Sequence, residues 1–258
     1  MKIGILIPST SKNRNWKCIK ESYLYNCLLK SLLITMNKEH DYELYIVIDN
    51  DDPIYSLENE QKELLRFKQI ITNLDIIFLN TDTIPKGWVT HMWNKAFKTA
   101  YDNNCDYFFQ CGDDIIFQDK NWVNESIAKL KEHNDVGLTG PIDLDRWNCG
   151  EHTRPGSDRF IQTQSFVSRK HMELFGYYFP PDIKNWYCDD WMTKVYYPDY
   201  FYLIHNFIKN TGGEPRYEVI GSLDKHCPIR KKCFELIEED KKKIKYQYGS
   251  ESDYIYIK

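Results

Sequence analysis

Two adjacent acids interrupt an apolar stretch in the middle of the chain. In YFFQCGDDIIFQD, residues 107–119, Asp113 and Asp114 follow FFQCG and precede IIF. Carboxylate oxygens are the ligands that hard divalent cations such as Mg²⁺ and Mn²⁺ prefer, and these ions keep coordination positions for phosphate or water. Gly-Asp-Asp is also common in turns. Because these acids stand at the end of a predicted strand, we favour a metal site at the edge of a sheet.

A second acid pair, Asp189 and Asp190, begins a predicted helix in CDDWMTKVYY. Acids at this position can cap a helix or interact favourably with its dipole. A carboxylate that faces an acceptor molecule can also take the proton from an attacking hydroxyl. The two roles are compatible within one pair, and we expect one acid, Asp190 ahead of Asp189, to be a general base.

The elements that must position these acids follow a β-α-β pattern. Apolar runs predict strands at residues 3–7, 43–49, 74–80 and 105–111, and helical periodicity appears between them at residues 22–36, 58–71 and 87–104. This alternation predicts an α/β fold with a mostly parallel central sheet flanked by helices. The carboxyl ends of parallel strands share one edge, where ligands bind. We therefore expect the loops PSTSKNRN and DNDDP to lie beside Asp113 and Asp114.

The second half of the chain is less regular. Its pattern predicts a helix at residues 125–133, strands at 136–141 and 160–168, and a charged helix at 229–246, with an aromatic segment around WYCDDWMTKVYYPDYFYLI. The chain has no internal repeat and no low-complexity linker, so we expect a single domain over residues 1–258 with a smaller, irregular second half.

Composition narrows the classes of partner. The formal charge is −4 and basic residues are spread along the chain, which argues against a nucleic-acid partner. No apolar stretch approaches the ~20 residues of a membrane helix. The eight cysteines form no C-x-x-C pair, which suits reduced thiols in a cytoplasmic protein. Richness in Lys, Asn, Ile and Tyr is typical of AT-rich genomes, those of some viruses and parasites included; for a viral source the location would be the host cytoplasm or the virion.

Four segments together resemble the GT-A fold of nucleotide-sugar-dependent glycosyltransferases, of the DxD type and similar to family 2. They are ILIPST, IVIDNDDP, GWVTHMWNKAFKTA and FFQCGDDIIF. The resemblance covers residues 1–140 in order and spacing, with a weaker likeness to about residue 230. It implies a Rossmann-like sheet, a nucleotide-sugar-binding half at 1–140, and an acceptor-binding half with a C-terminal helix at 141–258. The chain departs from the pattern at Cys111, where the family has the first acid of DxD.

The resemblance also implies roles for individual residues. It places Mn²⁺ or Mg²⁺ on Asp113, with Asp114 and His226 as further ligands. For the donor nucleotide it implies contacts from Pro8, Ser9, Thr10, Asp49, Asp51, Lys86, Asn94, Gly112 and Asp114. A carboxylate at Asp49 could accept a hydrogen bond from uracil N3–H, which would favour UDP. Lys225 and Arg230 flank His226 and could neutralise phosphate.

On the acceptor side, tryptophan faces are candidates for stacking on a sugar, and each Trp can equally be a core residue. The candidates are Trp147, Trp186 and Trp191. The segment 147–157, rich in Gly and polar residues, is a candidate mobile loop over the donor.

The expected activity is transfer of a sugar from a UDP-sugar to a hydroxyl of a glycan, a protein or a small molecule, with inversion favoured over retention. A sugar-nucleotide pyrophosphorylase is an alternative, but ILIPSTSKNRN lacks its Gly-rich loop because no glycine follows Gly4. A non-catalytic nucleotide-sugar-binding module is a second alternative, supported by Cys111. A viral RNA polymerase palm also carries Gly-Asp-Asp, but this chain is too short and too acidic for one. The sequence leaves the sugar, the acceptor and the oligomeric state open.

Overall fold

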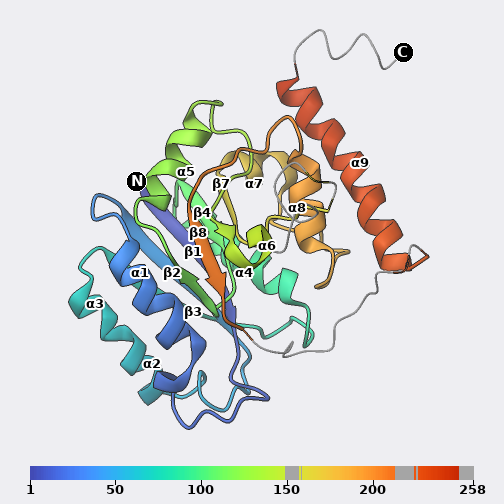
Figure 1. Cartoon of the computed structure of the whole chain (residues 1–258). Coiled ribbons are helices and arrows are strands. Elements are labelled where there is room, and N and C mark those ends of the chain that lie inside the picture. Colours follow the sequence, from blue (N-terminus) through green and yellow to red (C-terminus); the bar gives the residue numbers. More distant parts are fainter. Residues whose placement is uncertain (149–156, 158, 213–223, 225, 250–258) are drawn as a thin grey trace.

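A five-stranded sheet is the middle layer of the computed structural model, which describes residues 1–148, 157, 159–212, 224 and 226–249 (Figure 1). The strand order is β3-β2-β1-β4-β7. The first four strands are parallel and β7 is antiparallel to β4. Their bounds are β1 (Lys2–Ser9), β2 (Asp41–Ile48), β3 (Leu74–Asn80), β4 (Tyr107–Gln110) and β7 (Ser165–Ser168). The expected α/β fold with a mostly parallel sheet is confirmed.

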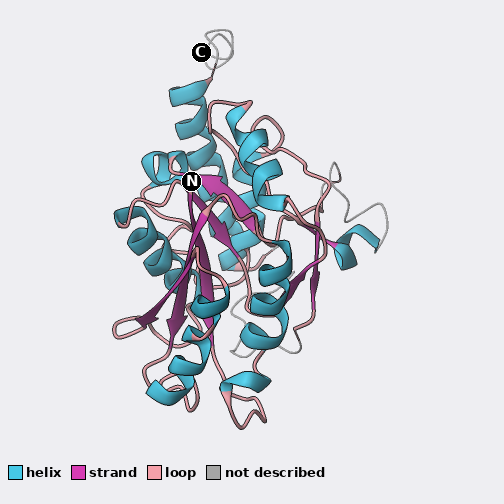
Figure 2. Cartoon of the chain, turned by 90° about the vertical axis from the view of Figure 1, so that its left-hand side faces the viewer, coloured by secondary structure: helices cyan, strands magenta, loops and turns pink. Residues whose placement is uncertain are grey.

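Helices cover both faces of this sheet, as Figures 1 and 2 show. One face carries the short helices η1 and η2, together with α1, α2, α3 and α5. The other carries α4, α7, α8 and α9. The bounds are η1 (Ile19–Glu21), η2 (Leu24–Leu29), α1 (Lys30–Thr35), α2 (Glu58–Leu65), α3 (Phe67–Ile70), α4 (Val89–Asp102), α5 (Trp122–Lys131), α7 (Lys170–Phe175), α8 (Cys188–Tyr196) and α9 (Pro228–Tyr248).

Side-chain alternation along β1 divides the core into two parts. Ile3, Ile5 and Ile7 belong to the cluster under η2 and α1, whereas Leu6 belongs to the cluster under α4. This follows from the two-residue period of a strand. Gly4 lets α4 approach closely, because a Cβ there would lie 3.0 Å from the Cβ of Ala100. The sheet is therefore buried on both faces, as parallel sheets are.

A second, three-stranded sheet has the order β5-β8-β6 and was not predicted. It consists of β5 (Ile115–Phe117), β8 (Phe207–Asn210) and β6 (Ile142–Asp143), and α6 (Leu144–Asn148) follows β6. β5 directly follows Asp113 and Asp114 and pairs antiparallel with β8. The late segment 207–210 is thereby brought beside the acid pair.

Two predicted strands differ from the structure. Residues 136–141 form isolated bridges at Leu138 and Thr139 instead of a strand. Gly137 and Gly140 have φ of 140° and 139°, and Pro141 has no N–H to donate, so the segment cannot continue a ladder. The predicted strand 160–168 is regular only from Ser165 onward. In both irregular segments the sequence predicts a strand, but among the described residues the backbone there has no neighbouring strand with which to pair regularly.

One further predicted helix is confirmed. The helix expected at residues 22–36 is present as the π-helical turn η2 continued by α1. Seven cysteines lie in the described residues and all are free thiols. Among the residues that the structure describes, no helix combines the length and the hydropathy that crossing a membrane requires.

His171 lies at the centre of an aromatic cluster on the α4 face. Its Nδ1 is 2.8 Å from the Tyr196 hydroxyl, and its Nε2 is 3.0 Å from the carbonyl oxygen of Tyr178. The rings of Phe97 and Phe175 pack against it at centroid distances of 5.7 and 5.0 Å. Burial lowers the pKa of His171 to about 4, so the folded protein holds a neutral imidazole.

Acidification should therefore destabilise the fold through His171. Its pKa is 6.5 in the unfolded chain and about 4 in the folded one, so below pH 6.5 the unfolded state binds the proton first and stability falls until about pH 4. The full difference corresponds to about 3 kcal/mol. Urea unfolding at neutral and at mildly acidic pH should show this loss in the wild type and a smaller loss in His171→Gln. The exposed His205 provides the control His205→Gln, which should follow the wild type. Equal pH dependence in the wild type and His171→Gln would contradict the assignment.

Candidate functional site

The ends of β1, β2 and β4 meet at one edge of the sheet. Ser9 is in register with Ile48, and Leu6 is in register with Gln110. The loops that follow these strands, at residues 9–12, 49–55 and 111–114, are consequently neighbours. This is the carboxyl edge at which open α/β sheets bind ligands.

The carboxylate of Asp52 holds the first two loops together. It is fully buried and accepts hydrogen bonds from the Thr10 hydroxyl at 2.8 Å and from the Ser11 backbone N–H and hydroxyl at 2.7 and 2.5 Å. The backbone N–H groups of Ile54 and Tyr55 donate to it at 3.0 and 2.8 Å. Burial by itself would raise the pKa of Asp52, but these hydrogen bonds lower it below its usual value. Asp52 was not among the predicted residues, which in this loop were Asp49 and Asp51. The only local feature that marks Asp52 in the sequence is the proline that follows it.

Asp113 is buried directly beside the β1 loop. The hydroxyl of Ser9 donates to its Oδ2 at 2.5 Å, and Ser9 itself is buried. The structure therefore brings together Ser9 and Asp113, which the sequence analysis placed in one site. Pro8 and Thr10 flank Ser9 at the same strand end.

Cys111, at the position of the expected first acid, is fully buried. Burial, together with the neighbouring charges of Asp113 and Asp114, raises the pKa of its thiol well above the usual value. Its carbonyl oxygen accepts a hydrogen bond from Trp93 Nε1 at 3.3 Å. The next residue, Gly112, donates its N–H to Gln164 Oε1 at 3.2 Å. A neutral thiol thus supports the strand end without adding a charge to it.

Asp114 is half-buried and lies between two glycines. A Cβ at Gly112 would stand 2.5 Å from its Oδ1, and a Cβ at Gly212 would stand 1.7 Å from its Oδ2. Its carbonyl oxygen accepts hydrogen bonds from the N–H and the hydroxyl of Thr211, at 2.9 and 2.8 Å. The sequence analysis did not foresee Thr211 and Gly212, which follow β8.

A network of charges surrounds the β2 loop. Lys12 donates to Asp49 at 3.2 Å and also to Asp51, and Lys86 donates to Asp51 at 3.0 Å. Hydrogen bonds from Lys12 and Lys86 lower the pKa of Asp51 to about 2. Asp49 is buried and accepts a longer bond, 3.4 Å, from the Thr81 hydroxyl. The predicted residues Asp49, Asp51 and Lys86 are thus in one network, and Lys12 is the member that the prediction missed.

Asn94 has a different environment from the one expected. Its Oδ1 accepts from the backbone N–H groups of Tyr178 and Phe179 at 3.0 and 2.8 Å, and its Nδ2 donates to the carbonyl of Phe179 at 2.8 Å. The side chain therefore ties α4 to the segment that precedes α8. A nucleotide contact from Asn94 stays a prediction and would require exchange of these bonds.

The second acid pair lies in the first turn of α8. Asp190 accepts a hydrogen bond from Lys194, one turn later, at 3.2 Å. Asp189 keeps a partly accessible edge, but protein packs closely around it. Burial raises the pKa of Asp189 to about 7; the charge of Arg146 on α6 opposes the shift and Asp190 adds to it. The two acids therefore differ in environment, and burial tunes Asp189 toward neutrality.

The remaining predicted residues are dispersed. His226 is exposed on the turn before α9, where its backbone N–H donates to Asp224 at 2.9 Å. No group of three or more His, Cys, Asp and Glu side chains among the described residues is placed to hold a metal ion, so the structure does not bring His226 together with Asp113 and Asp114. Lys225 and most of the predicted loop at residues 147–157 lie outside the described residues.

The adjacent carboxylates still fit a hard cation. Mg²⁺ and related ions commonly bind through one or two carboxylates, with water and substrate phosphates completing the shell. Asp113 and Asp114 offer this donor set at a strand end. These two residues fit a hard cation because they supply carboxylate oxygens.

The three tryptophans considered for acceptor stacking differ in exposure. Trp191 is fully buried and donates from Nε1 to Asp240 at 3.0 Å, so it is a core residue. Trp147 is half-buried and packs on Phe207 at a centroid distance of 5.5 Å. Trp186 is 37% exposed and stacks on Tyr187, at the start of α8. Trp186 is accordingly the tryptophan with a face available beside the acid pair.

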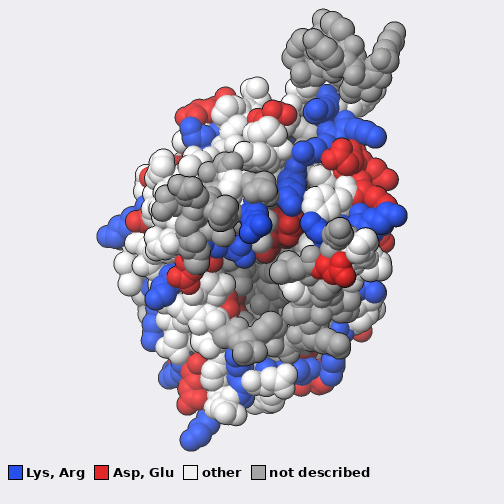
Figure 3. All heavy atoms as spheres, turned by 45° about the vertical axis from the view of Figure 1, so that its right-hand side comes forward, with Lys and Arg blue, Asp and Glu red and all other residues white. Residues whose placement is uncertain are grey.

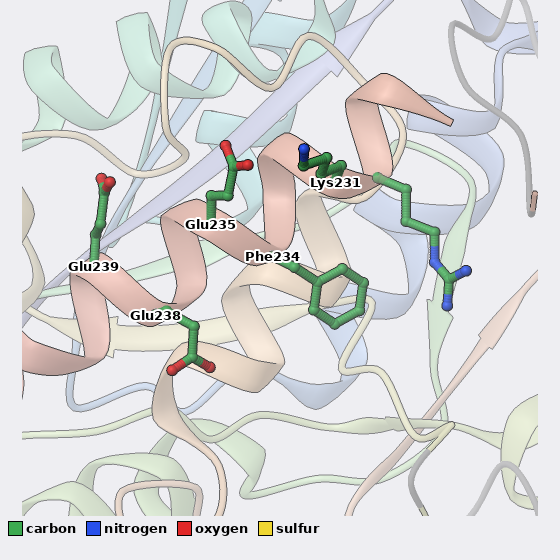
Figure 4. A pocket seen from close by; sticks show the side chains of 6 residues that line it. Lys231, Phe234, Glu235, Glu238 and Glu239 are labelled. Carbon is green, nitrogen blue, oxygen red and sulfur yellow. The ribbon is translucent and has the colours of Figure 1, made fainter. Parts of the chain in front are cut away.

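A hollow of about 710 Å³ runs along α9 (Figure 4). Two cations lie over the ring of Phe234, with Lys194 Nζ 4.6 Å and Arg230 Cζ 5.5 Å from its centroid. Because Lys194 also pairs with Asp190, the hollow adjoins the acid pair of α8. The residues that line it are Arg230, Lys231, Phe234, Glu235, Glu238 and Glu239.

The face in Figure 3 is also hollowed near its centre, with acidic and basic side chains at the rim. Ligands bind preferentially at concave surfaces with a few convergent polar groups.

Replacing Asp52 should destabilise the carboxyl edge. In Asp52→Asn an NH₂ group replaces one of two oxygens that accept five hydrogen bonds, so the free energy of unfolding should fall by about 3 kcal/mol. Urea unfolding at neutral pH measures the change. Asp82→Asn is the control, because Asp82 is an exposed acid in a loop at the same edge, and it should change stability by less than about 0.5 kcal/mol. A similarly small change in Asp52→Asn would contradict the role of this carboxylate.

The chain is similar to known proteins in structure but not detectably in sequence. No protein-family model matches the chain, and no curated protein matches it in sequence. S. aureus TarS 1-349 in complex with UDP-GlcNAc has a TM-score of 0.61 and 16% identity, over 93% of this chain and 66% of that one. The same protein in complex with UDP has a TM-score of 0.55 and 16% identity, over 81% and 60%.

A third similar structure is the mannosyltransferase PcManGT from Pyrobaculum calidifontis in complex with GDP-Man and Mn²⁺. Its TM-score is 0.50 at 13% identity, over 79% of this chain and 54% of that one. The chain spans between 37% and 66% of the length of the TarS structures it matches. At these identities the likeness shows the fold, and this chain shares its α/β architecture with proteins solved in complex with nucleotide sugars.

Proposed function

We propose that the protein is a glycosyltransferase that transfers a sugar from a UDP-sugar to an acceptor hydroxyl with inversion at the anomeric carbon. One observation carries the proposal: Asp113 and Asp114 follow β4, and Asp113 is hydrogen-bonded to Ser9 at the end of the neighbouring strand β1, in a fold shared with a protein solved with UDP-GlcNAc. Position at the carboxyl edge supports a ligand-binding role for both acids.

The donor nucleotide would lie across the loops after β1 and β2. Pro8, Ser9 and Thr10 would contact it from one side and Asp49 from the other, with Asp49 accepting from uracil N3–H. Asp52 holds these two loops at a constant spacing. Lys12 and Lys86 lie beside the loop after β2 and are paired with Asp51.

The diphosphate would lie near Asp113, Asp114 and the N–H of Gly112. These carboxylates would hold Mn²⁺ or Mg²⁺, which when bound supplies positive charge to the leaving diphosphate. The hydroxyl of Ser9 orients Asp113. His226 stays a predicted further ligand.

Asp189 is the base that we propose, in place of the Asp190 favoured by the sequence. Its carboxylate would take the proton of the acceptor hydroxyl while that oxygen bonds to the anomeric carbon and the bond from that carbon to the diphosphate oxygen breaks. A base with a pKa near 7 is suited to this transfer close to neutrality. Asp190, paired with Lys194, would orient the acceptor, and Trp186 could stack on an acceptor sugar.

Donor turnover with a panel of UDP- and GDP-sugars tests the proposal. With Mn²⁺ present the protein should release UDP from one UDP-sugar, and Asp113→Asn and Asp114→Asn should each reduce the rate by about 100-fold or more. Asp106→Asn, at the opposite end of β4, is the control and should retain activity. Nucleoside triphosphate formation that depends on pyrophosphate would indicate a pyrophosphorylase instead, and donor binding without turnover would indicate a binding module.

The pH profile tests the base. Because burial raises the pKa of Asp189 to about 7, kcat/KM should rise with pH through that value as the carboxylate forms, and then level off. Asp189→Asn should lower kcat by about 100-fold or more and remove the rise. Asp190→Asn should keep the rise with a smaller loss. A profile with the same acid limb in Asp189→Asn would refute this assignment.

A further inference from the structure

The segment after β8 encloses the carboxylate of Asp114. A Cβ built on Gly212 would lie 1.7 Å from Asp114 Oδ2 and 2.6 Å from its Cγ, which is well inside van der Waals contact. On the other side, a Cβ on Gly112 would lie 2.5 Å from Oδ1. The carboxylate therefore occupies the space that side chains at both glycines would need.

Backbone conformation does not explain these glycines. Among the described residues, the glycines with φ in the left-handed region are Gly87, Gly137, Gly140 and Gly176. Gly112 and Gly212 are not among them, so a residue with a Cβ could adopt their backbone angles. A residue with a side chain at either position would instead displace the carboxylate of Asp114.

Hydrogen bonds fix the same contact through the main chain. Asn210 pairs with Ile115 across β5 and β8, and Thr211 then bonds to the carbonyl oxygen of Asp114 through its N–H at 2.9 Å and its hydroxyl at 2.8 Å. Asn210 Oδ1 accepts from the N–H of Gly212 at 2.9 Å. The segment is thus held in register with the acid from both ends.

We infer that residues 210–212 are a positioning element for Asp114, and that Gly212 is required because its missing side chain gives the carboxylate its place. Thr211 holds the backbone of the acid, and Gly212 sets the direction of its side chain. The consequence for ligands rests on the proposed function: a displaced carboxylate would bind the cation and the donor diphosphate less well.

A double-mutant cycle tests the contact in the ligand-free protein. In Gly212→Ala the new methyl group displaces a carboxylate at the end of a short side chain, so the chain should fold with a lowered urea midpoint. In Asp114→Ala the carboxylate is gone, and adding Gly212→Ala should shift the midpoint by less than half as much. Such non-additivity is the signature of direct contact. Equal shifts in both backgrounds would overturn the inference.

Gly176→Ala is the matched control. Gly176 ends α7 with φ of 76°, and a Cβ there would meet nothing within 4 Å. Its substitution should lower the midpoint equally with Asp114 or Ala at position 114, because strain of the backbone does not involve the acid.

A ligand measurement extends the test. Mn²⁺ binding in the presence of UDP, followed by the loss of the free Mn²⁺ electron paramagnetic resonance signal, should weaken by about 10-fold or more in Gly212→Ala, as when groups that orient metal ligands are removed. It should not change in Gly176→Ala. Wild-type affinity in Gly212→Ala would overturn the inference while leaving the proposed function intact. If the wild type binds neither Mn²⁺ nor UDP, the proposed function fails, and the stability cycle alone decides whether residues 210–212 position Asp114.

Discussion

A single buried carboxylate, that of Asp52, holds the carboxyl edge of the sheet together. It accepts hydrogen bonds from the β1 loop and from its own loop after β2. A buried charge is stable only when it is fully hydrogen-bonded. If either loop moved away, the Asp52 carboxylate would lose hydrogen bonds while still buried, which would cost free energy. The hydrogen bonds to the Asp52 carboxylate therefore fix the spacing between the ends of β1 and β2. Ser9, which orients Asp113, depends on it.

Two acids of the chain, Asp51 and Asp189, have opposite pKa shifts because their environments differ. Asp51 lies between two lysines and its pKa falls to about 2, whereas Asp189 is enclosed by protein and its pKa rises to about 7. The first is anionic at all physiological pH values, and the second can exchange a proton near neutrality. Carboxyl groups with separated pKa values can provide fixed charge at one position and acid–base chemistry at another.

Two parts of the chain, separated by about a hundred residues, build the surroundings of Asp114. β4 delivers the acid from the first half of the chain, and β8 returns to place Thr211 and Gly212 against it, 97 residues later in the chain for Thr211. The second half therefore contributes to the same edge of the sheet. It completes the edge formed by the first half through β-pairing between β5 and β8.

Local patterns in the sequence determined the architecture. Strand and helix periodicity, and the rule that parallel strands end at one edge, were sufficient to place Ser9, Asp49 and Asp113 together, because these features depend on neighbours along the chain and on strand direction. The same reasoning failed at residues 136–141, where apolar residues lack regular pairing partners.

Only the tertiary structure distinguished the environments of the acids. Asp49, Asp51 and Asp52 are near-equivalent in DNDDP, and burial plus five hydrogen bonds distinguish the last one. Asn94 looked available for a ligand, but distant backbone groups occupy its amide. The place of Gly212 beside Asp114 and the raised pKa of Asp189 likewise arise from contacts between residues far apart in the chain. Desolvation and packing between distant segments produce these environments and pKa shifts. Neither can be read from residues that are neighbours in the sequence.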